Sequence, residues 1–177
     1  DDDNFRRGRP SLHKAFPEGK AVLAGDCLLT HAFEILSLAP NLTAEQKIEC
    51  ISVLSRHAGG HGMIAGQIMD LDAEKKQITL EALQDIHLRK TAALFISALS
   101  FAGIISKSSQ EIRYTLEIFA QHLGLAFQII DDILDVTTDE QTLGKSAASD
   151  LSKEKSTYVS ILGLENAKKQ ASYHTDI

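Results

Sequence analysis

Apolar residues recur every three or four positions along most of this chain, a spacing that is typical of amphipathic helices. Pro40 ends the first such stretch, and Thr43 with Gln46 predicts a capping box at the start of the second. No strand-length alternation and no internal repeat accompany these stretches. The pattern predicts an all-α bundle of long helices. The expected helices are residues 18–38, 43–57, 63–71, 79–100 and 109–135, with a last helix from about residue 157.

Composition fits one domain of an ordinary globular protein. The chain has 177 residues, of which 44% are apolar and 24% are charged, and its formal net charge of −6 argues against nucleic-acid binding. Cys27 and Cys50 lie in apolar helical patterns, so we expect reduced core cysteines. No apolar run reaches the roughly 18 residues of a membrane span, so we expect no transmembrane segment. Because the chain opens on Asp1 without an initiator Met, it reads as an excerpt of a longer protein.

The strongest chemical signal is a set of three carboxylates inside the apolar run 127–135. In a helix, Asp131 and Asp135 stand one turn apart on the same face, with Asp132 beside them. Like charges this close repel one another unless a cation lies among them, and ligands that are all oxygen favour Mg²⁺, with Mn²⁺ as the second candidate. The alternative is an exposed last turn of a helix, but carboxylates are disfavoured at helix C-termini.

Basic residues near the beginning of the chain are weaker signals. Arg6 and Arg7 are adjacent, and a guanidinium can form a bidentate fork with phosphate. A surface ion pair with the preceding aspartates is the default interpretation of this pair. His13 is an oxyanion contact or a structural surface residue, with equal support for each.

Three further groups each have an ordinary explanation when taken alone. Gln67 and Asp70 share a helix face, which alone indicates a polar helix edge. The Lys90–Thr91 pair borders an apolar face, from which a lysine can snorkel. Lys145 and Lys155 lie in or beside a polar segment that reads as a solvated loop. No EF-hand loop, Walker phosphate loop, zinc motif or nucleophile elbow is found.

Taken together and in this order, these segments resemble the trans-type prenyl diphosphate synthases, which make geranyl, farnesyl and geranylgeranyl diphosphates. The resemblance runs from Asp1 to about Ala167 and includes residues 23–26, 66–71, 87–91, 127–135 and 155–164. It implies a single domain over 1–177, the central part of an isoprenoid synthase fold with mostly antiparallel helices around a cavity. It also implies that N-terminal and C-terminal helices are missing, together with the paired aspartates that would precede Asp1.

The resemblance implies an enzyme that joins an allylic diphosphate to isopentenyl diphosphate by Mg²⁺-assisted ionisation, with a farnesyl- or geranylgeranyl-type product favoured. Its implied metal ligands are Asp1, Asp131, Asp132 and Asp135. Its implied diphosphate ligands are Arg6, Lys90 and Lys145 for the allylic substrate, Arg7 and His13 for isopentenyl diphosphate, and Lys155 beside a closing loop. Its implied cation-stabilising residues are Gln67, Asp70, Thr91 and Gln128, with Lys90 also counted as catalytic.

Several properties of the whole protein follow only as expectations from this resemblance. A homodimer is usual in the family, and we expect a cytoplasmic protein, or an organellar one if a transit peptide precedes Asp1. Leu28, Leu29 and Phe33 are candidates to line a product tunnel, although core packing is the expected role of each. Two rival interpretations are a class I terpene cyclase and a non-catalytic partner subunit. The aspartates of residues 131–135 and the Arg6–Arg7 pair argue against the cyclase, and the retained aspartates and lysines argue against the partner subunit.

Overall fold

The structure is a computed structural model that describes residues 4–6, 8–138 and 155–176. Within these ranges the chain is almost entirely helical, which confirms the all-α prediction. The elements are β1 (Phe5–Arg6), β2 (Arg9–Pro10), α1 (Leu12–Ala15), α2 (Glu18–Leu38), α3 (Ala44–Ala58), α4 (Met63–Ala73), α5 (Leu80–His87), η1 (Leu88–Ala92), α6 (Ala93–Ile105), α7 (Gln110–Thr137), α10 (Tyr158–Leu162) and α11 (Leu164–Thr175).

Side-chain caps fix the starts of α3, α5 and α7. Thr43 Oγ1 accepts the amide of Gln46 at 3.3 Å, and the Gln46 side chain accepts the amide of Thr43 at 3.1 Å, which confirms the capping box. Thr79 and Ser109 cap α5 and α7 in a similar way, each accepting the amide three residues later. These caps use residues within one turn of each helix end, so the sequence alone located them.

The structure departs from the sequence prediction at three places. The helix expected over 79–100 contains a π-helical segment, η1, between α5 and α6. Gly163, with a φ of 77°, divides the expected last helix into α10 and α11. A short antiparallel hairpin joins β1 to β2, and Gly8 takes a φ of 72° in its turn.

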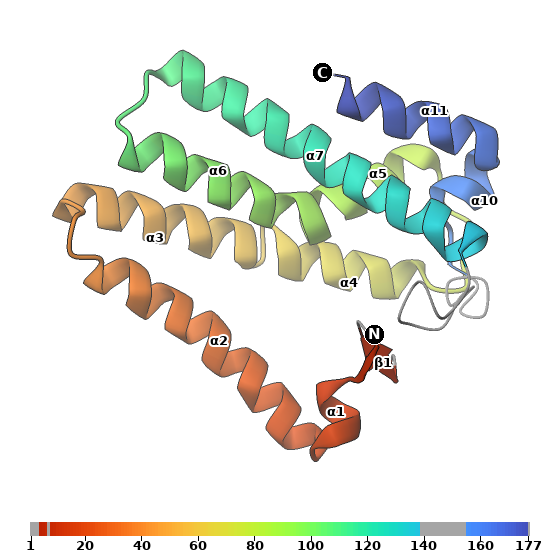
Figure 1. Ribbon diagram of the computed structural model, residues 1–177, viewed down its shortest axis with the longest axis horizontal. Coiled ribbons are helices and arrows are strands. Elements are labelled where there is room, and N and C mark those ends of the chain that lie inside the picture. Colours follow the sequence, from red (N-terminus) through yellow and green to blue (C-terminus); the bar gives the residue numbers. More distant parts are fainter. Residues whose placement is uncertain (1–3, 7, 139–154, 177) are drawn as a thin grey trace.

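Helix α7 lies at the centre of the described bundle. Figure 1 shows α3, α6, α7 and α11 side by side in that order, with α4 and α5 at the end of the bundle near η1. A buried cluster joins α5, α7, α10 and α11, and its members are Leu83, Ile129, Tyr158, Ala167 and Ala171. This packing brings the aspartate-bearing end of α7 next to the beginning of α10.

Helix α2 extends away from the other helices (Figure 1) and has no buried residue. Leu28 and Leu29 are 72% and 38% exposed, and Phe33 is half-buried. The expectation of core packing for Leu28 and Leu29 is therefore wrong in this chain, because α2 packs mainly against α1 and α3 and leaves its other faces open. The exposure of Cys27 on the same helix likewise corrects its expected burial, whereas Cys50 is buried as expected.

Two helices have the length and apolar composition of a membrane span, Glu18–Leu38 and the continuous helix Leu80–Ile105. Charged residues interrupt both helices, so neither contains an uninterrupted apolar run of 18 residues. Core helices of helical bundles meet the same criteria, and Leu80–Ile105 packs against α3, α4 and α7. Length and composition alone therefore do not assign a membrane span.

Candidate active site

The π-helical segment η1 carries the Lys90–Thr91 pair to the junction of α4 and α7. The Nζ of Lys90 donates to Asp70 Oδ2 on α4 at 2.7 Å. The Nζ of Lys155 donates to the same oxygen at 3.0 Å, although it is 85 residues away from Asp70 in the sequence. The structure thus brings together three residues that the sequence suggested separately.

Two ammonium groups on one carboxylate set the charge of this junction. Burial raises the pKa of Asp70, but the hydrogen bonds and charges of Lys90 and Lys155 outweigh it, so the pKa lies below its usual value. Asp70 is therefore ionised at neutral pH. The Nζ of Lys155 also lies 3.8 Å from Glu74 Oε1, so this lysine stands between two carboxylates. Ammonium groups such as those of Lys90 and Lys155 are hydrogen-bond donors that phosphate oxygens can accept.

A polar stripe runs along one face of α7. The Thr91 hydroxyl on η1 donates to Gln128 Oε1, which fixes Gln128 beside the Lys90–Thr91 pair. Asp131 and Asp135 follow Gln128 after three and seven residues, so all three share one face of the helix. The face therefore presents an amide nearest the π-helical segment and carboxylates farther along.

Asp132, four residues after Gln128, lies at the buried edge of the same face of α7, with 5% of its surface exposed. Its Oδ2 accepts the amide of Tyr158, the first residue of α10, at 2.8 Å. This bond joins the aspartate cluster to the helix that follows the residues 139–154. Asp132 therefore has a structural contact that the sequence did not indicate, and its place among metal ligands stays a prediction.

We expect Asp132→Ala to lower the free energy of unfolding by about 2 kcal/mol, because it leaves the buried amide of Tyr158 without an acceptor. Urea unfolding of the full-length protein measures this change. Asp132→Asn keeps an oxygen acceptor and should cost less. Equal stability of Asp132→Ala and the unchanged protein would contradict the structural role.

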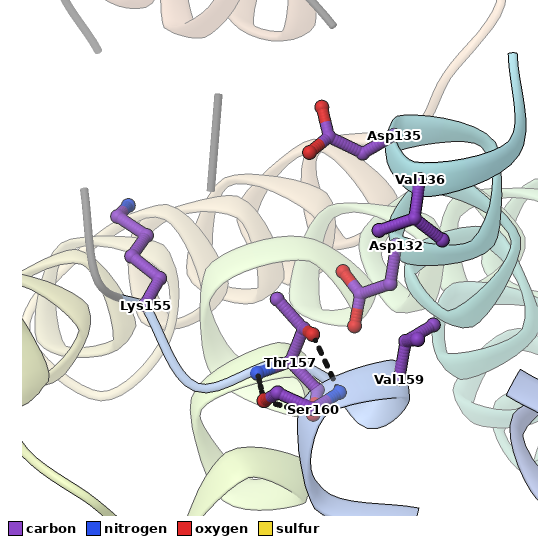
Figure 2. Close-up of a pocket in the computed structure, with 7 residues that line it drawn as sticks. All are labelled: Asp132, Asp135, Val136, Lys155, Thr157, Val159 and Ser160. Atoms are coloured by element: carbon purple, nitrogen blue, oxygen red, sulfur yellow. Dashed lines mark hydrogen bonds between the residues drawn. The ribbon is translucent and has the colours of Figure 1, made fainter. Parts of the chain in front are cut away.

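A small pocket of about 70 Å³ lies between the end of α7 and the beginning of α10. Figure 2 shows Asp132 and Asp135 on one side of it and Lys155 on the other, with Thr157 and Ser160 below. The pocket thus combines carboxylates, an ammonium group and hydroxyls. It borders the same acidic end of α7 and the same Lys155 that the preceding contacts identify.

Asp131 and Asp135 are suited to hold Mg²⁺ together with a phosphorylated ligand. Asp135 is 2% exposed and Asp131 is half-buried, one turn apart on α7. Among the described residues, no three His, Cys, Asp or Glu side chains converge as a metal cluster. Mg²⁺ in phosphate-binding sites uses one or two carboxylates and completes its shell with water and phosphate oxygens. Two aspartates therefore fit an ion that is shared with a diphosphate.

Comparison with known proteins identifies the family to which this chain belongs. A model of the polyprenyl synthetase family matches residues 1–176, nearly the whole chain. The chain belongs to the polyprenyl synthetase family. The farnesyl diphosphate synthase of Haemophilus influenzae is 47% identical over 173 residues, which cover 97% of this chain and 59% of that protein. Geranylgeranyl pyrophosphate synthase 7 of Arabidopsis thaliana, a chloroplastic protein, is 41% identical over 95% of this chain and 49% of its own length.

A solved structure supports the same assignment of fold. The geranyltransferase of Helicobacter pylori, complexed with magnesium and isoprenyl diphosphate, superimposes with a TM-score of 0.91 at 38% sequence identity. The match covers 99% of this chain and 57% of that one. This chain therefore has the isoprenoid synthase fold, and it spans about three fifths of the length of its bacterial farnesyl diphosphate synthase relatives.

Some of the remaining predicted site residues lie among the described residues, and the others do not. Arg6 is exposed on β1, and His13 is half-buried on α1 with its Nε2 3.4 Å from Ser11 Oγ, so the structure does not join either to the Lys90–Asp70–Lys155 trio. Gln67 is half-buried on α4, three residues before Asp70. The predicted ligands Asp1, Arg7 and Lys145 lie outside the described residues.

Sequence reasoning missed the support beneath the site. His87 stacks on Tyr158 with ring centroids 5.7 Å apart, and both side chains are buried below the Asp70 trio. Within the described part of the chain, the His87 Nδ1 has no hydrogen-bond partner. Burial lowers the pKa of His87 to about 4. The only signal in the sequence was the position of His87 three residues before Lys90.

The low pKa of His87 predicts acid sensitivity. The pKa of His87 is about 4 in the folded protein and 6.5 for an unperturbed histidine, as in the unfolded chain. The unfolded chain therefore binds more protons between these pH values, and stability falls as the pH drops. Lowering the pH from 7 to 4.5 should therefore cost about 2 kcal/mol through this group alone. His87→Phe, which retains a stacked ring, should remove that part of the loss in urea unfolding at the two pH values. If the free energies of unfolding of His87→Phe and of the unchanged protein fell equally between the two pH values, His87 would not be the source of the acid sensitivity.

Proposed function

We propose that the full-length protein containing this chain joins an allylic diphosphate to isopentenyl diphosphate and releases a longer trans-prenyl diphosphate. The observation that carries this proposal is the meeting of the α7 stripe with the Lys90–Thr91 pair. Carboxylates for a metal, ammonium groups for a diphosphate and neutral oxygens for a cation converge there. The names of the relatives support farnesyl or geranylgeranyl diphosphate as the product.

The proposed reaction breaks the carbon–oxygen bond of the allylic diphosphate and leaves an allylic cation and a diphosphate. Mg²⁺ held by Asp131 and Asp135, with Asp1 and Asp132 as further proposed ligands, would supply Lewis-acid stabilisation of the charge on the leaving diphosphate. In this proposal Lys90 donates hydrogen bonds to the leaving diphosphate, and Lys155 lies close to it. Arg6 and Lys145 are further proposed ligands of the same diphosphate. Arg7 and His13 are proposed to bind the diphosphate of isopentenyl diphosphate. These positively charged side chains interact most strongly with the diphosphates where water is excluded.

The end of the site that lies away from Asp131 and Asp135 would stabilise the allylic cation. Thr91 and Gln128 are held together by their hydrogen bond, so their lone pairs are fixed in place before ionisation. Gln67 and Asp70 add oxygens from α4 in this proposal. The double bond of isopentenyl diphosphate then attacks the cation and forms the new carbon–carbon bond, which leaves a tertiary cation. Loss of a proton from C2 of the isopentenyl unit, with the released diphosphate as the proposed acceptor, forms the double bond of the product. Exclusion of water prevents hydrolysis from competing.

Assay of the full-length protein with isopentenyl diphosphate and each allylic diphosphate, with and without Mg²⁺, tests the proposal. Mass spectrometry should detect a Mg²⁺-dependent product longer by one or more isoprene units, and Mn²⁺ in place of Mg²⁺ tests the second ion. A cyclic hydrocarbon formed without isopentenyl diphosphate would support a terpene cyclase instead. Absence of any product would favour a non-catalytic partner subunit. Light scattering of the same preparation tests the proposed homodimer.

A further inference from the structure

The π-helical segment η1 is held between two glycines from different helices. A Cβ on Gly66 of α4 would lie 2.2 Å from the Lys90 nitrogen and 2.7 Å from Lys90 Cα. A Cβ on Gly124 of α7 would lie 2.4 Å from Ala92 Cβ and 2.6 Å from Ala92 Cα. Real Cβ atoms essentially never come within 3.0 Å of such neighbours. Each helix therefore reaches η1 only because it presents no side chain at the point of contact.

The same two helices also hold the side chains of η1. Asp70 follows Gly66 by four residues and accepts the ammonium of Lys90. Gln128 follows Gly124 by four residues and accepts the hydroxyl of Thr91. Residues four apart share a helix face, so each helix offers η1 a bare backbone contact and, one turn later, a hydrogen-bond acceptor. A shift of η1 against either glycine would therefore change the geometry of these hydrogen bonds.

We propose that Gly66 and Gly124 are positioning residues that place Lys90 and Thr91 for prenyl transfer, an inference that rests on the proposed function. At Gly66 and Gly124 the nearest atoms include main-chain atoms of η1, which cannot rotate away as the end of a flexible side chain can. An alanine at Gly66 would have to increase the 2.2 Å separation to at least 3.0 Å. A displacement of about 1 Å at a catalytic group can lower a rate about 100-fold.

The two glycines should differ in their kinetic effects because they contact different ends of η1. Gly66 contacts Lys90, whose ammonium binds the diphosphate in both the ground state and the transition state. Gly66→Ala should therefore raise the KM for the allylic substrate as well as lower kcat. Gly124 contacts Ala92, next to Thr91, whose oxygen acts on charge that develops only on ionisation. Gly124→Ala should lower kcat and leave this KM nearly unchanged.

The test uses the full-length protein with three alanine variants. Gly66→Ala and Gly124→Ala should each lose about 100-fold in kcat/KM. Gly103→Ala is the matched control, since Gly103 is also a buried helix–helix glycine, but its nearest neighbour at 3.0 Å is the flexible side chain of Arg113. The kcat/KM of Gly103→Ala should stay within about twofold of that of the unchanged protein, because this position has no main-chain atom at its point of closest contact. Adding Ala92→Gly to Gly124→Ala removes the nearest clashing atom and should restore part of the lost kcat.

Hydrogen exchange of residues 88–92 gives a readout that needs no activity, and it should be faster in Gly66→Ala and Gly124→Ala but not in Gly103→Ala. Unchanged kcat, KM and exchange in both variants would overturn the proposal. Loss of the fold in either variant, seen by circular dichroism, would also overturn it and make that glycine a general structural requirement. If the unchanged protein forms no product, the proposed function fails. Exchange then still decides whether the glycines hold η1.

Discussion

Asp131→Ala should reduce prenyl transfer by the full-length protein about 1,000-fold, because it removes a carboxylate from the proposed Mg²⁺ site. Asp131 is half-buried and lies on the α7 face that also carries Gln128 and Asp135. Without its charge, Mg²⁺ and the leaving diphosphate are held less tightly in the transition state than in the unchanged protein. Steady-state kinetics at saturating Mg²⁺ measures the loss in kcat.

The fold should survive this substitution, since Asp131 is half-buried and lies outside the buried cluster of α5, α7, α10 and α11. Circular dichroism and thermal unfolding check that the variant is folded. Asp72→Ala is the matched control, because Asp72 is an exposed carboxylate on α4. It should retain the activity of the unchanged protein. Near-normal turnover by Asp131→Ala would show that the metal assignment is wrong.

Helix starts and the fold class could be predicted because their causes are local. Thr43, Thr79 and Ser109 each cap the helix that follows, and the apolar spacing between caps identifies the buried faces. The polar stripe on α7 was also predictable, since Gln128, Asp131 and Asp135 share a face in any helix. These features depend on neighbours within a few turns of the chain.

The π-helical segment could not be predicted, because its cause lies in other helices. Nothing in the sequence of residues 88–92 marks it, and the contacts that hold it come from Gly66 and Gly124. The hydrogen bond from Tyr158 to Asp132 likewise needs the relative positions of α7 and α10. A glycine in a helix interior was the one available signal, since it costs stability unless a close approach requires it.

The exposure of α2 has a similar explanation. Its spacing of Leu28, Leu29 and Phe33 predicts an apolar face, and it forms the helix with the expected bounds Glu18–Leu38. The spacing of apolar residues does not predict which other part of the protein packs against that face, because this depends on the tertiary structure. A sequence pattern therefore predicted the element correctly and its burial incorrectly.

Lys90→Met should lower kcat for prenyl transfer about 300-fold and raise the KM for the allylic diphosphate, because it removes one charged donor from the leaving group. Methionine keeps an unbranched side chain of similar length, so the packing around η1 is retained. Asp70 keeps Lys155 as its partner at 3.0 Å, and no buried carboxylate is left without a cation. The free energy of unfolding should therefore change much less than the activity.

Measuring the KM for isopentenyl diphosphate distinguishes direct binding of the allylic diphosphate by Lys90 from an effect of its charge on the whole site. In the proposed site Lys90 binds the allylic diphosphate only, so the KM for the second substrate should remain within about twofold of its normal value. Lys168→Met is the matched control, since Lys168 pairs with Glu165 on the exposed side of α11 and should leave both KM values unchanged. If Lys90→Met raised both KM values equally, its ammonium would act through the overall positive potential of the site. The direct contact with the leaving diphosphate would then be refuted.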